Sequence, residues 1–312
     1  MERRLIECVP NFSEGRNPET VRAIAESIAR VAGVKVLRTE TDPDHNRCVI
    51  TFAGTPEGVR EAAFVGVAEA ARRIDLNRHS GVHPRTGAAD VVPFVPLEGV
   101  TLNECADMAH DVGRQVWETL GIPVYFYEAA ALSPERVPLE TIRRGHLAPD
   151  LGGPALHPTA GACAIGARKI LIAFNLVLNT AEVSIARAIA RKIRASSGGL
   201  AYVKALGLFL ASRNLAQVSI NLTDYEQTPL HAVFEAVAGE ARALGAGILE
   251  SEIIGLLPRQ AMEQAAAHFL KCGNFHSGLI IENALSENAL SENALTANRC
   301  EPAALPDPDR VP

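Results

Sequence analysis

One order of predicted strands and helices occurs twice along the chain, and it constrains the fold more than any other feature of the sequence. Between residues 5 and 96, β-branched apolar runs and segments of helical period follow each other as strand, helix, strand, strand, helix, strand. The same order returns between residues 169 and 256. Each copy is the split βαβ arrangement, in which two helices cover one face of a sheet. The sequence therefore predicts an α/β fold of the α+β type, with two βαββαβ-like subdomains whose mixed sheets face a groove.

The chain carries additional segments around these two copies. A helix over 102–120 and a strand over 122–127 follow the first copy, and the segment 132–154, rich in Pro, Arg and Gly, is expected to cross the surface. We place the boundary near Thr180, which gives subdomains 1–180 and 181–298. Three copies of a five-residue unit, ENALSENALSENALT, match neither the helical nor the heptad period and indicate a repetitive tail that ends at 312.

Composition restricts the class of partner. The net charge of −6 and the 5% content of aromatic residues argue against a nucleic-acid groove. No apolar run approaches 18 residues, so no membrane segment is indicated. The six cysteines show no C-x-x-C pairing, which favours reduced thiols in a cytoplasmic protein. A small molecule is the expected partner.

The stretch HSGVHPRTGAADVVPFVP, residues 79–96, places polar groups directly before a buried strand. His79 and His83 are four residues apart, but the glycine between them and the proline after them disfavour a helix, so a metal site is a weak interpretation. Either histidine could simply bond to backbone in a loop. With Arg85 and Asp90 beside it, His83 is the better candidate for general acid–base chemistry.

A second polar loop, TDPDHNR over 41–47, joins two strands at one end of a sheet. Asp42 and Asp44 fit a plain turn as well as they fit a site. Calcium is disfavoured, because the glycine and the terminal glutamate of a calcium loop are missing. Asn46 and Arg47 could instead bind a carboxylate.

The third candidate is GACAIGARK, residues 161–169, which precedes a long apolar strand over 169–178. It is either a tight turn or a place where backbone approaches a flat or anionic ligand, with Arg168 available for a carboxylate. It matches neither a P-loop nor GxGxxG, so nucleotide binding is not indicated. His157, in a second HP-x-x-GA segment, receives no role.

Five segments together resemble the glutamate formimidoyltransferase family. They are ECVPNFSEGR (7–16), DHNRCVITFAG (44–54), HPRTGAADVVPFVP (83–96), GARKILIAFN (166–175) and AQVSINLTD (216–224). The resemblance implies two α/β subdomains facing a folate-binding groove, and a homodimer. It also implies transfer of the formimino group of N-formimino-L-glutamate to N5 of tetrahydrofolate, with release of glutamate in histidine breakdown. The chain has no room for the cyclodeaminase domain that animal members carry.

The resemblance assigns roles to particular residues. The family's catalytic histidine corresponds to His83, which would take the N5 proton and return one to the departing nitrogen. Asp44, Asn46, Arg47 and Arg85 are candidates for binding the substrate, and Arg168 is a further candidate for a carboxylate. The folate-contacting segment corresponds to Gly161, Ala162, Cys163, Ala164, Ile165, Gly166, Ala167, Arg168, Lys169 and Ile170.

The sequence leaves two other functions open. N-formylglutamate could serve as donor on the same fold, because sequence motifs do not distinguish nitrogen from oxygen on the transferred carbon. A folate-binding protein without catalysis is the other alternative, and the proton-transferring character of His83 argues against it.

Overall fold

The computed structural model describes residues 3–43, 45–80 and 85–283. Asp44, His83 and all of the tail beyond residue 283 lie outside these ranges. Within them, no helix combines the length and apolar character needed to cross a membrane.

The N-terminal unit is a seven-stranded sheet with three long helices on one face. Its strands lie in the order β3, β4, the consecutive pair β1 and β2, β5, β7, β6. The β5–β7 and β6–β7 pairs are parallel and the other pairs are antiparallel. The elements are β1 (Leu5–Cys8), β2 (Asn11–Phe12), α1 (Pro18–Ala29), β3 (Val34–Asp42), β4 (Arg47–Gly54), α2 (Pro56–Arg73), β5 (Ala89–Glu98), α3 (Leu102–Leu120), β6 (Val124–Glu128), α4 (Leu139–Arg143) and β7 (Cys163–Ala167).

The C-terminal unit is a four-stranded sheet in the order β11, β8, β10, β9. All of its pairs are antiparallel, so the expectation of a mixed sheet is wrong for this unit. The second copy has no added parallel strand comparable to β7, which is what makes the first sheet mixed. Its elements are β8 (Ile172–Leu178), α5 (Val183–Ile193), β9 (Val203–Leu210), β10 (Leu215–Leu222), α6 (Leu230–Ala243), β11 (Ile248–Ile254) and α7 (Arg259–Leu270).

The predicted internal repeat is confirmed. In the first unit the strands β5, β1, β4 and β3 lie in the order that β11, β8, β10 and β9 have in the second. In each copy the first and last strands pair with each other, as β1 with β5 and β8 with β11. The two middle strands form a hairpin that extends the sheet on the other side of the first strand.

Local sequence signals explain where the helices of the first unit begin and end. The Asn17 side chain accepts hydrogen bonds from the backbone N–H groups of Glu19 and Thr20 at the start of α1. Thr101 and Glu104 form a capping box at the start of α3, and Gly121, with φ of 65°, ends that helix in the left-handed conformation.

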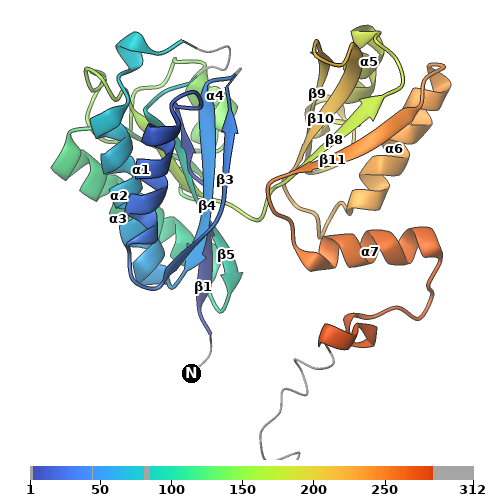
Figure 1. The fold of residues 1–312 in the computed structure, drawn as a ribbon, viewed down its shortest axis with the longest axis horizontal. Coiled ribbons are helices and arrows are strands. Elements are labelled where there is room, and N and C mark those ends of the chain that lie inside the picture. Colours follow the sequence, from blue (N-terminus) through green and yellow to red (C-terminus); the bar gives the residue numbers. More distant parts are fainter. Residues whose placement is uncertain (1–2, 44, 81–84, 284–312) are drawn as a thin grey trace, which may run out of the picture.

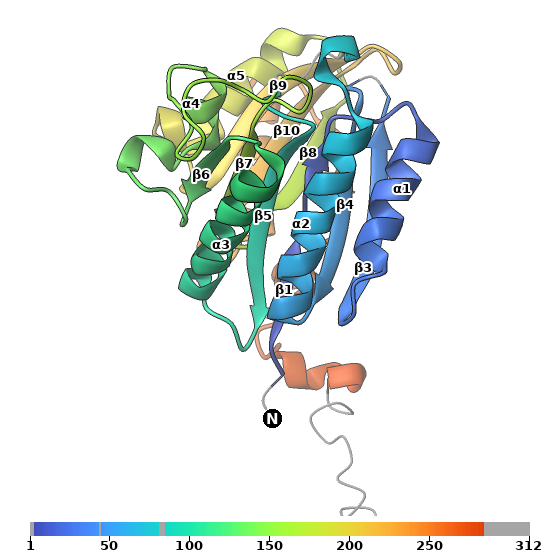
Figure 2. The same ribbon diagram turned by 90° about the vertical axis from the view of Figure 1, so that its left-hand side faces the viewer.

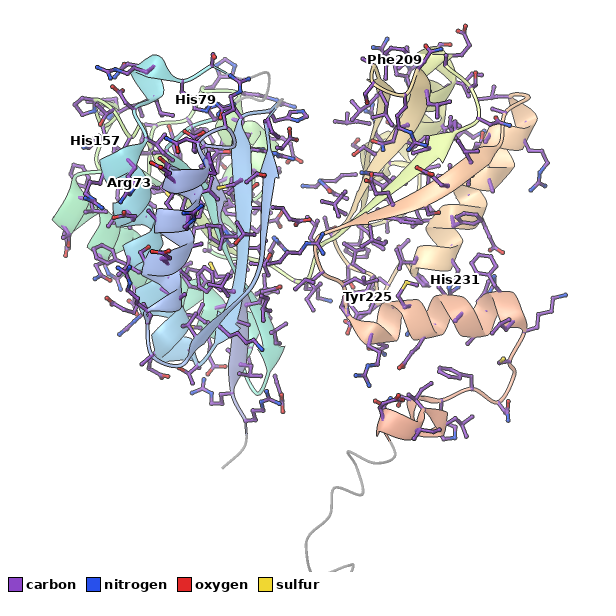
Figure 3. The ribbon with its side chains drawn as sticks, in the orientation of Figure 1. Arg73, His79, His157, Phe209, Tyr225 and His231 are labelled. Carbon is purple, nitrogen blue, oxygen red and sulfur yellow. The ribbon has the colours of Figure 1, made fainter. Side chains whose placement is uncertain are left out.

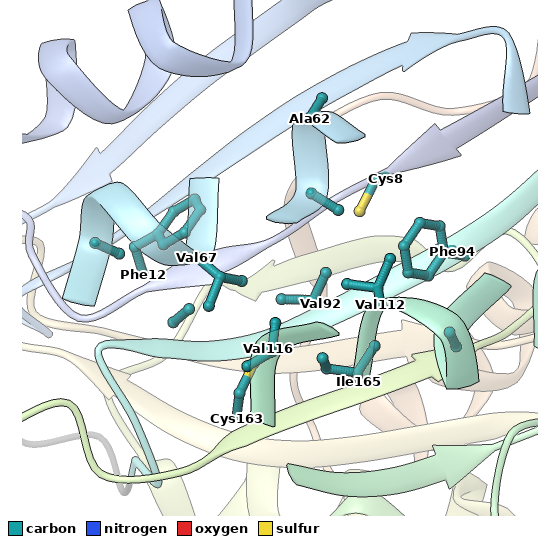
Figure 4. Packing of buried hydrophobic residues seen from close by; sticks show 14 of the residues in the cluster. Cys8, Phe12, Ala62, Val67, Val92, Phe94, Val112, Val116, Cys163 and Ile165 are labelled. Atoms are coloured by element: carbon teal, nitrogen blue, oxygen red, sulfur yellow. The ribbon is translucent and has the colours of Figure 1, made fainter. Parts of the chain in front are cut away.

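The helices bury one face of each sheet. Figure 4 shows Phe12, Val92 and Phe94 from the strands packing against Val67 of α2 and Val112 of α3. In the second unit, a separate core joins alternate residues of β8, β9 and β10 to α5 and α6. The helices α1, α2, α3, α5 and α6 therefore lie on the outer sides of the molecule, and the other faces of the two sheets are turned toward each other (Figures 1 and 2). The short helix α4 packs on that other face of the first sheet.

The change from one sheet to the other falls between Ala167 and Ile172. This is earlier than the boundary expected near Thr180, and β8 belongs to the second sheet. The sequence suggested one strand over 169–178, whereas β8 begins at Ile172. The segment 168–171 leaves β7 and enters β8, so it crosses from one unit to the other directly beside the space between the sheets.

Candidate functional site

A cleft of about 620 Å³ lies between the two sheets. Its walls come from β1, β4, β5 and β6 of the first unit, and from β8, β9, β10 and the end of β11 in the second. The connecting segment 168–171 lines it as well. A volume of this size is within the range of sites for small molecules, and junctions between units are favoured places for them.

The floor of the cleft is apolar where the side chains of Pro93 and Tyr127 line it. Pro93 of β5, Gly166 of β7 and Tyr127 of β6 lie side by side in the strand register. Gly166 leaves room for the neighbouring aromatic ring, since a Cβ atom there would stand 2.5 Å from Cδ1 of Tyr127. Burial raises the pKa of the Tyr127 phenol further above its already high ordinary value, so the hydroxyl stays protonated near neutral pH.

A carboxylate and a guanidinium stand at either side of this floor. Glu7 of β1 pairs with Val95, and the backbone N–H of Arg168 bonds to Phe94 on the other side of the same strand. Burial raises the pKa of Glu7, and the charge of Arg168 offsets part of that effect. The Arg168 side chain donates to the carbonyl of Lys169 at 3.0 Å. Among the described residues it has no ion-pair partner, which leaves its charge available to a ligand.

Arg47, predicted to bind a carboxylate, also lines the cleft. It opens β4, and its neighbours Val49 and Thr51 follow at period two along the same face. Within the ranges that the structure covers, no hydrogen bond or ion pair engages the guanidinium of Arg47. It is therefore a second cation of the cleft that a carboxylate could occupy.

Asn46 and Arg85 lie together, but their polar groups are used within the protein. The Asn46 amide accepts from the N–H of Gly15 at 2.9 Å and donates to the carbonyl of Ser80 at 3.1 Å. Arg85 donates to the backbone carbonyls of His45 and Asn46 at 2.9 and 3.1 Å. These contacts tie the 42–47 turn to the segment on either side of residues 81–84.

His79 belongs to the same group of contacts. Its Nε2 lies 2.6 Å from Nη1 of Arg85 and 3.0 Å from the carbonyl oxygen of Asn46. Burial lowers the pKa of His79, and the charge of Arg85 adds to that effect, so the ring is neutral near pH 7. His79 thus contacts the backbone carbonyl of Asn46, which is the structural role that the sequence left open for it.

Asp90, expected beside the histidine, faces a different arginine. Its carboxylate binds Arg143 of α4 at 2.6 Å and accepts from both the N–H and the hydroxyl of Thr86, at 2.6 and 2.8 Å. Arg143 lines the cleft. The segment 132–154, expected to cross the surface, thus supplies the arginine that binds Asp90, and Asp90 in turn holds Thr86, three residues after His83.

The segment 161–170 takes a form that the sequence did not indicate. Residues 163–167 are a fully buried strand between β5 and β6, rather than a turn. The sequence also predicted that this segment would face the 79–96 stretch across a groove. That prediction is wrong for β5, because β7 pairs with β5 in one sheet. Only Ala167, Arg168, Lys169 and Ile170 of the ten residues line the cleft, together with Leu171, the residue that follows them.

A second cavity, of about 700 Å³, lies at the end of the first unit. His79 and His157 both line it, and Figure 3 places the two rings on this unit, away from the second sheet. The Nδ1 atom of His157 accepts from the N–H of Ala160 at 3.0 Å. Arg85 and Thr86 line the same cavity, so the segment that contains His157 lies close to these two residues.

Several cleft residues were not among the sequence candidates. Glu7, Tyr127, Arg143 and Lys204 all line the cleft. Glu7 could have been found, because it alternates with Ile6 and Cys8, which face the core, and stands inside the first family-like segment. The other three come from elements whose placement beside the cleft depends on the tertiary fold.

Comparison with known proteins divides the chain at the place where one sheet ends and the other begins. Residues 5–168 match the formiminotransferase domain, N-terminal subdomain, and residues 173–295 match the formiminotransferase domain. A glutamate formimidoyltransferase of Thermoplasma acidophilum is 45% identical over 295 residues, which are 90% of this chain and 97% of that protein. One from Streptococcus pyogenes serotype M1 is 40% identical, over 90% of this chain and 99% of that protein.

A formimidoyltransferase-cyclodeaminase of Sus scrofa is 42% identical over 87% of this chain, a stretch that is 53% of the pig protein. The match to the two relatives named only for formimidoyl transfer therefore runs over nearly their whole length. The family expected from the five sequence segments is confirmed, and this chain belongs to the formiminotransferase family.

Proposed function

We propose that this protein is a one-carbon transferase that moves the formimino group of N-formimino-L-glutamate to N5 of tetrahydrofolate and releases L-glutamate. The observation that carries the proposal is the 40–45% identity to glutamate formimidoyltransferases over 90% of the chain. The cleft between the sheets supports it, because it offers apolar side chains together with the cations Arg47 and Arg168, which suit a folate with an aromatic head and a carboxylate tail.

The proposed catalytic residue is His83, which lies outside the described residues. A histidine that titrates near neutral pH can accept the proton that N5 loses as it attacks the amidine carbon, and can then protonate the departing nitrogen of glutamate. Asp90 supports this assignment indirectly. By holding Thr86 through two hydrogen bonds, it anchors the end of the segment that carries His83.

The structure suggests different tasks for the proposed binding residues. Arg168, Lys169 and Ile170 border the cleft and are proposed to contact folate. Arg47 is proposed to bind a substrate carboxylate. Arg85 and Asn46 are better suited to bracing the loops, since they bond to backbone groups of the protein. Asp44, the remaining proposed substrate ligand, lies outside the described residues.

The test is turnover with purified protein, tetrahydrofolate and each of two donors. We expect 5-formiminotetrahydrofolate from N-formimino-L-glutamate, and a loss of about 10²-fold or more in kcat for His83→Ala. A higher rate with N-formylglutamate would identify a formyltransferase instead. Folate binding without turnover of either donor would indicate a binding protein and would contradict the proposal.

A homodimer and a cytoplasmic location are also proposed, on the basis of the family resemblance. Light scattering should then give twice the 33.2 kDa mass of the chain. Of the five described cysteines all are free and four are buried, which suits a reducing compartment.

A further inference from the structure

The cleft contains one carboxylate whose surroundings call for a ligand. Glu7 lies on the cleft side of β1, at the centre of the first sheet between β4 and β5. No described residue donates a hydrogen bond to its carboxylate or pairs with it within 4 Å. Glu40 and Glu140, which line the same cleft, are instead paired with Arg38 and Lys204 at 2.9 Å.

Leaving a partly buried carboxylate without donors is unfavourable. Burial raises the pKa of Glu7, and Arg168, beyond ion-pair distance, offsets this only in part. A carboxylate has about four acceptor positions and is well suited to two parallel N–H donors. A ligand with two N–H groups on one carbon would supply them.

The floor next to Glu7 indicates that the ligand has an apolar face. Val9 follows Glu7 at period two and stands opposite Pro93, and Tyr127 lies on the same face of the sheet, two strands from Pro93. The side chains of Val9, Pro93 and Tyr127 all line the cleft and make this part of its floor apolar. Arg168 lies about two strand spacings, roughly 10 Å, from Glu7 on the other side of Val95.

We propose that Glu7 is a substrate-binding residue that accepts the paired N3–H and 2-amino donors of a 2-amino-4-oxo pteridine lying on the apolar floor of Val9, Pro93 and Tyr127. The inference rests on the proposed function and adds to it the position of the pteridine head. With that edge at Glu7, the far side of the ring points toward Arg168 and the connecting segment. The formamidinium group of the donor substrate has the same pair of N–H donors and is the other possible source of this chemistry.

The test compares Glu7→Gln with the unchanged protein by calorimetry. The first probe is 5-formyltetrahydrofolate, a stable folate, and the second is N-formimino-L-glutamate. We expect the variant to bind 5-formyltetrahydrofolate about 10- to 100-fold more weakly, because the amide lacks the charge and turns one donor toward the ligand's donors. Binding of the formimino donor should stay within about twofold.

Three comparisons separate this role from a general change in the cleft. Glu40→Gln removes another cleft carboxylate, one paired with the exposed Arg38, and should change neither affinity by more than about twofold. A 2-desamino-2-methyl analogue of 5-formyltetrahydrofolate lacks the exocyclic donor, so Glu7→Gln should weaken its binding much less. Glu7→Asp keeps the charge and should retain part of the affinity.

The outcomes are distinct. If the unchanged protein binds 5-formyltetrahydrofolate and Glu7→Gln binds it equally well, the assignment of Glu7 is overturned and the proposed function stands. A selective loss of the formimino donor would overturn the pteridine placement and assign Glu7 to the formamidinium. An equal loss of both ligands, or no binding of either by the unchanged protein, would overturn the inference, and the second result would overturn the proposed function as well.

Discussion

Ion pairs of this protein differ in how much water they have lost, and the Asp90–Arg143 pair is among the most buried, together with Asp150–Arg136. The Asp90 side chain is 8% exposed and that of Arg143 is 22% exposed. The Nε atom of Arg143 is buried and has no hydrogen-bond partner among the described residues. Most other pairs, such as Arg30–Glu26, lie in solvent, where they contribute little.

Asp90→Asn should therefore destabilise the protein by about 1–3 kcal/mol, because it leaves the Arg143 charge partly buried without its partner. Urea denaturation measures the change. Glu26→Gln, which breaks the exposed pair with Arg30, should cost no more than about 0.5 kcal/mol. Equal effects of the two substitutions would show that the Asp90 pair is not special.

Removing the charge of Glu7 should stabilise the protein, unlike the removal of the Asp90 charge, because burial disfavours the ionised form of Glu7. Its folded-state pKa is raised above the ordinary 4.5, so ionisation costs stability at neutral pH, and the cost disappears as the pH falls through the raised pKa. Glu7→Gln should thus unfold at a higher temperature than the unchanged protein at pH 7. The difference should shrink toward pH 4.5, and a stability loss at pH 7 would contradict this reading of the site.

Residue types and local spacing predicted part of this site. Asp90, Arg47 and Arg168 were identified as polar groups at the ends of strands, and the latter two border the cleft. The partner of Asp90 could not be predicted, since Arg143 is 53 positions away on a short helix of the crossing segment. Arg85 was selected as a candidate for binding the substrate, and only the fold shows that it bonds to backbone carbonyls of His45 and Asn46.

The strand β7 depends on its glycine for close packing against β6. A Cβ atom on Gly166 would stand 2.5 Å from both Cδ1 and the carbonyl oxygen of Tyr127. Gly166→Ala should destabilise the protein by about 1–3 kcal/mol and weaken folate binding, because the ring of Tyr127 must move off the floor. The matched control is Gly239→Ala in α6, where nothing lies within 4 Å and helix propensity should add up to about 1 kcal/mol. Thermal unfolding and calorimetry with 5-formyltetrahydrofolate measure both effects.

The elements that the sequence predicted well are those with strong period or clear caps. The ends of α3 were predicted to the residue, because a capping box opens it and a left-handed glycine closes it. β7 was missed because CAIGA is short and made of small residues, which have low strand propensity. Its strand conformation comes from pairing with β5 and β6, which is a tertiary effect.

At the scale of the whole molecule, the repeat explains both the symmetry and the cleft. Two copies of one topology each cover one sheet face with helices and leave the other face open, and these open faces meet (Figure 1). The sequence was sufficient for this architecture, since both copies follow from periodicity. It was insufficient for the cleft itself, which depends on how the segment 168–171 turns from β7 into β8.

Lys204 is the side chain that links the two units by charge across the cleft. Its Nζ atom, on β9, lies 2.9 Å from Glu140 of α4 and 3.9 Å from Glu128 at the end of β6. Both partners are in the first unit, so the pairs form only when the sheets face each other as they do here. The side chain of Lys204 is 43% exposed, and such a pair contributes at most about 1 kcal/mol.

Lys204→Met should therefore leave the unfolding temperature nearly unchanged and raise the KM for tetrahydrofolate about two- to fivefold, because a smaller fraction of molecules has the cleft assembled. Added salt should raise the KM of the unchanged protein in the same direction and affect the variant less. Lys192→Met is the matched control, since Lys192 pairs with Glu240 inside the second unit and should leave the KM unchanged. An equal salt dependence in the protein and the Lys204 variant would show that these charges do not hold the units together.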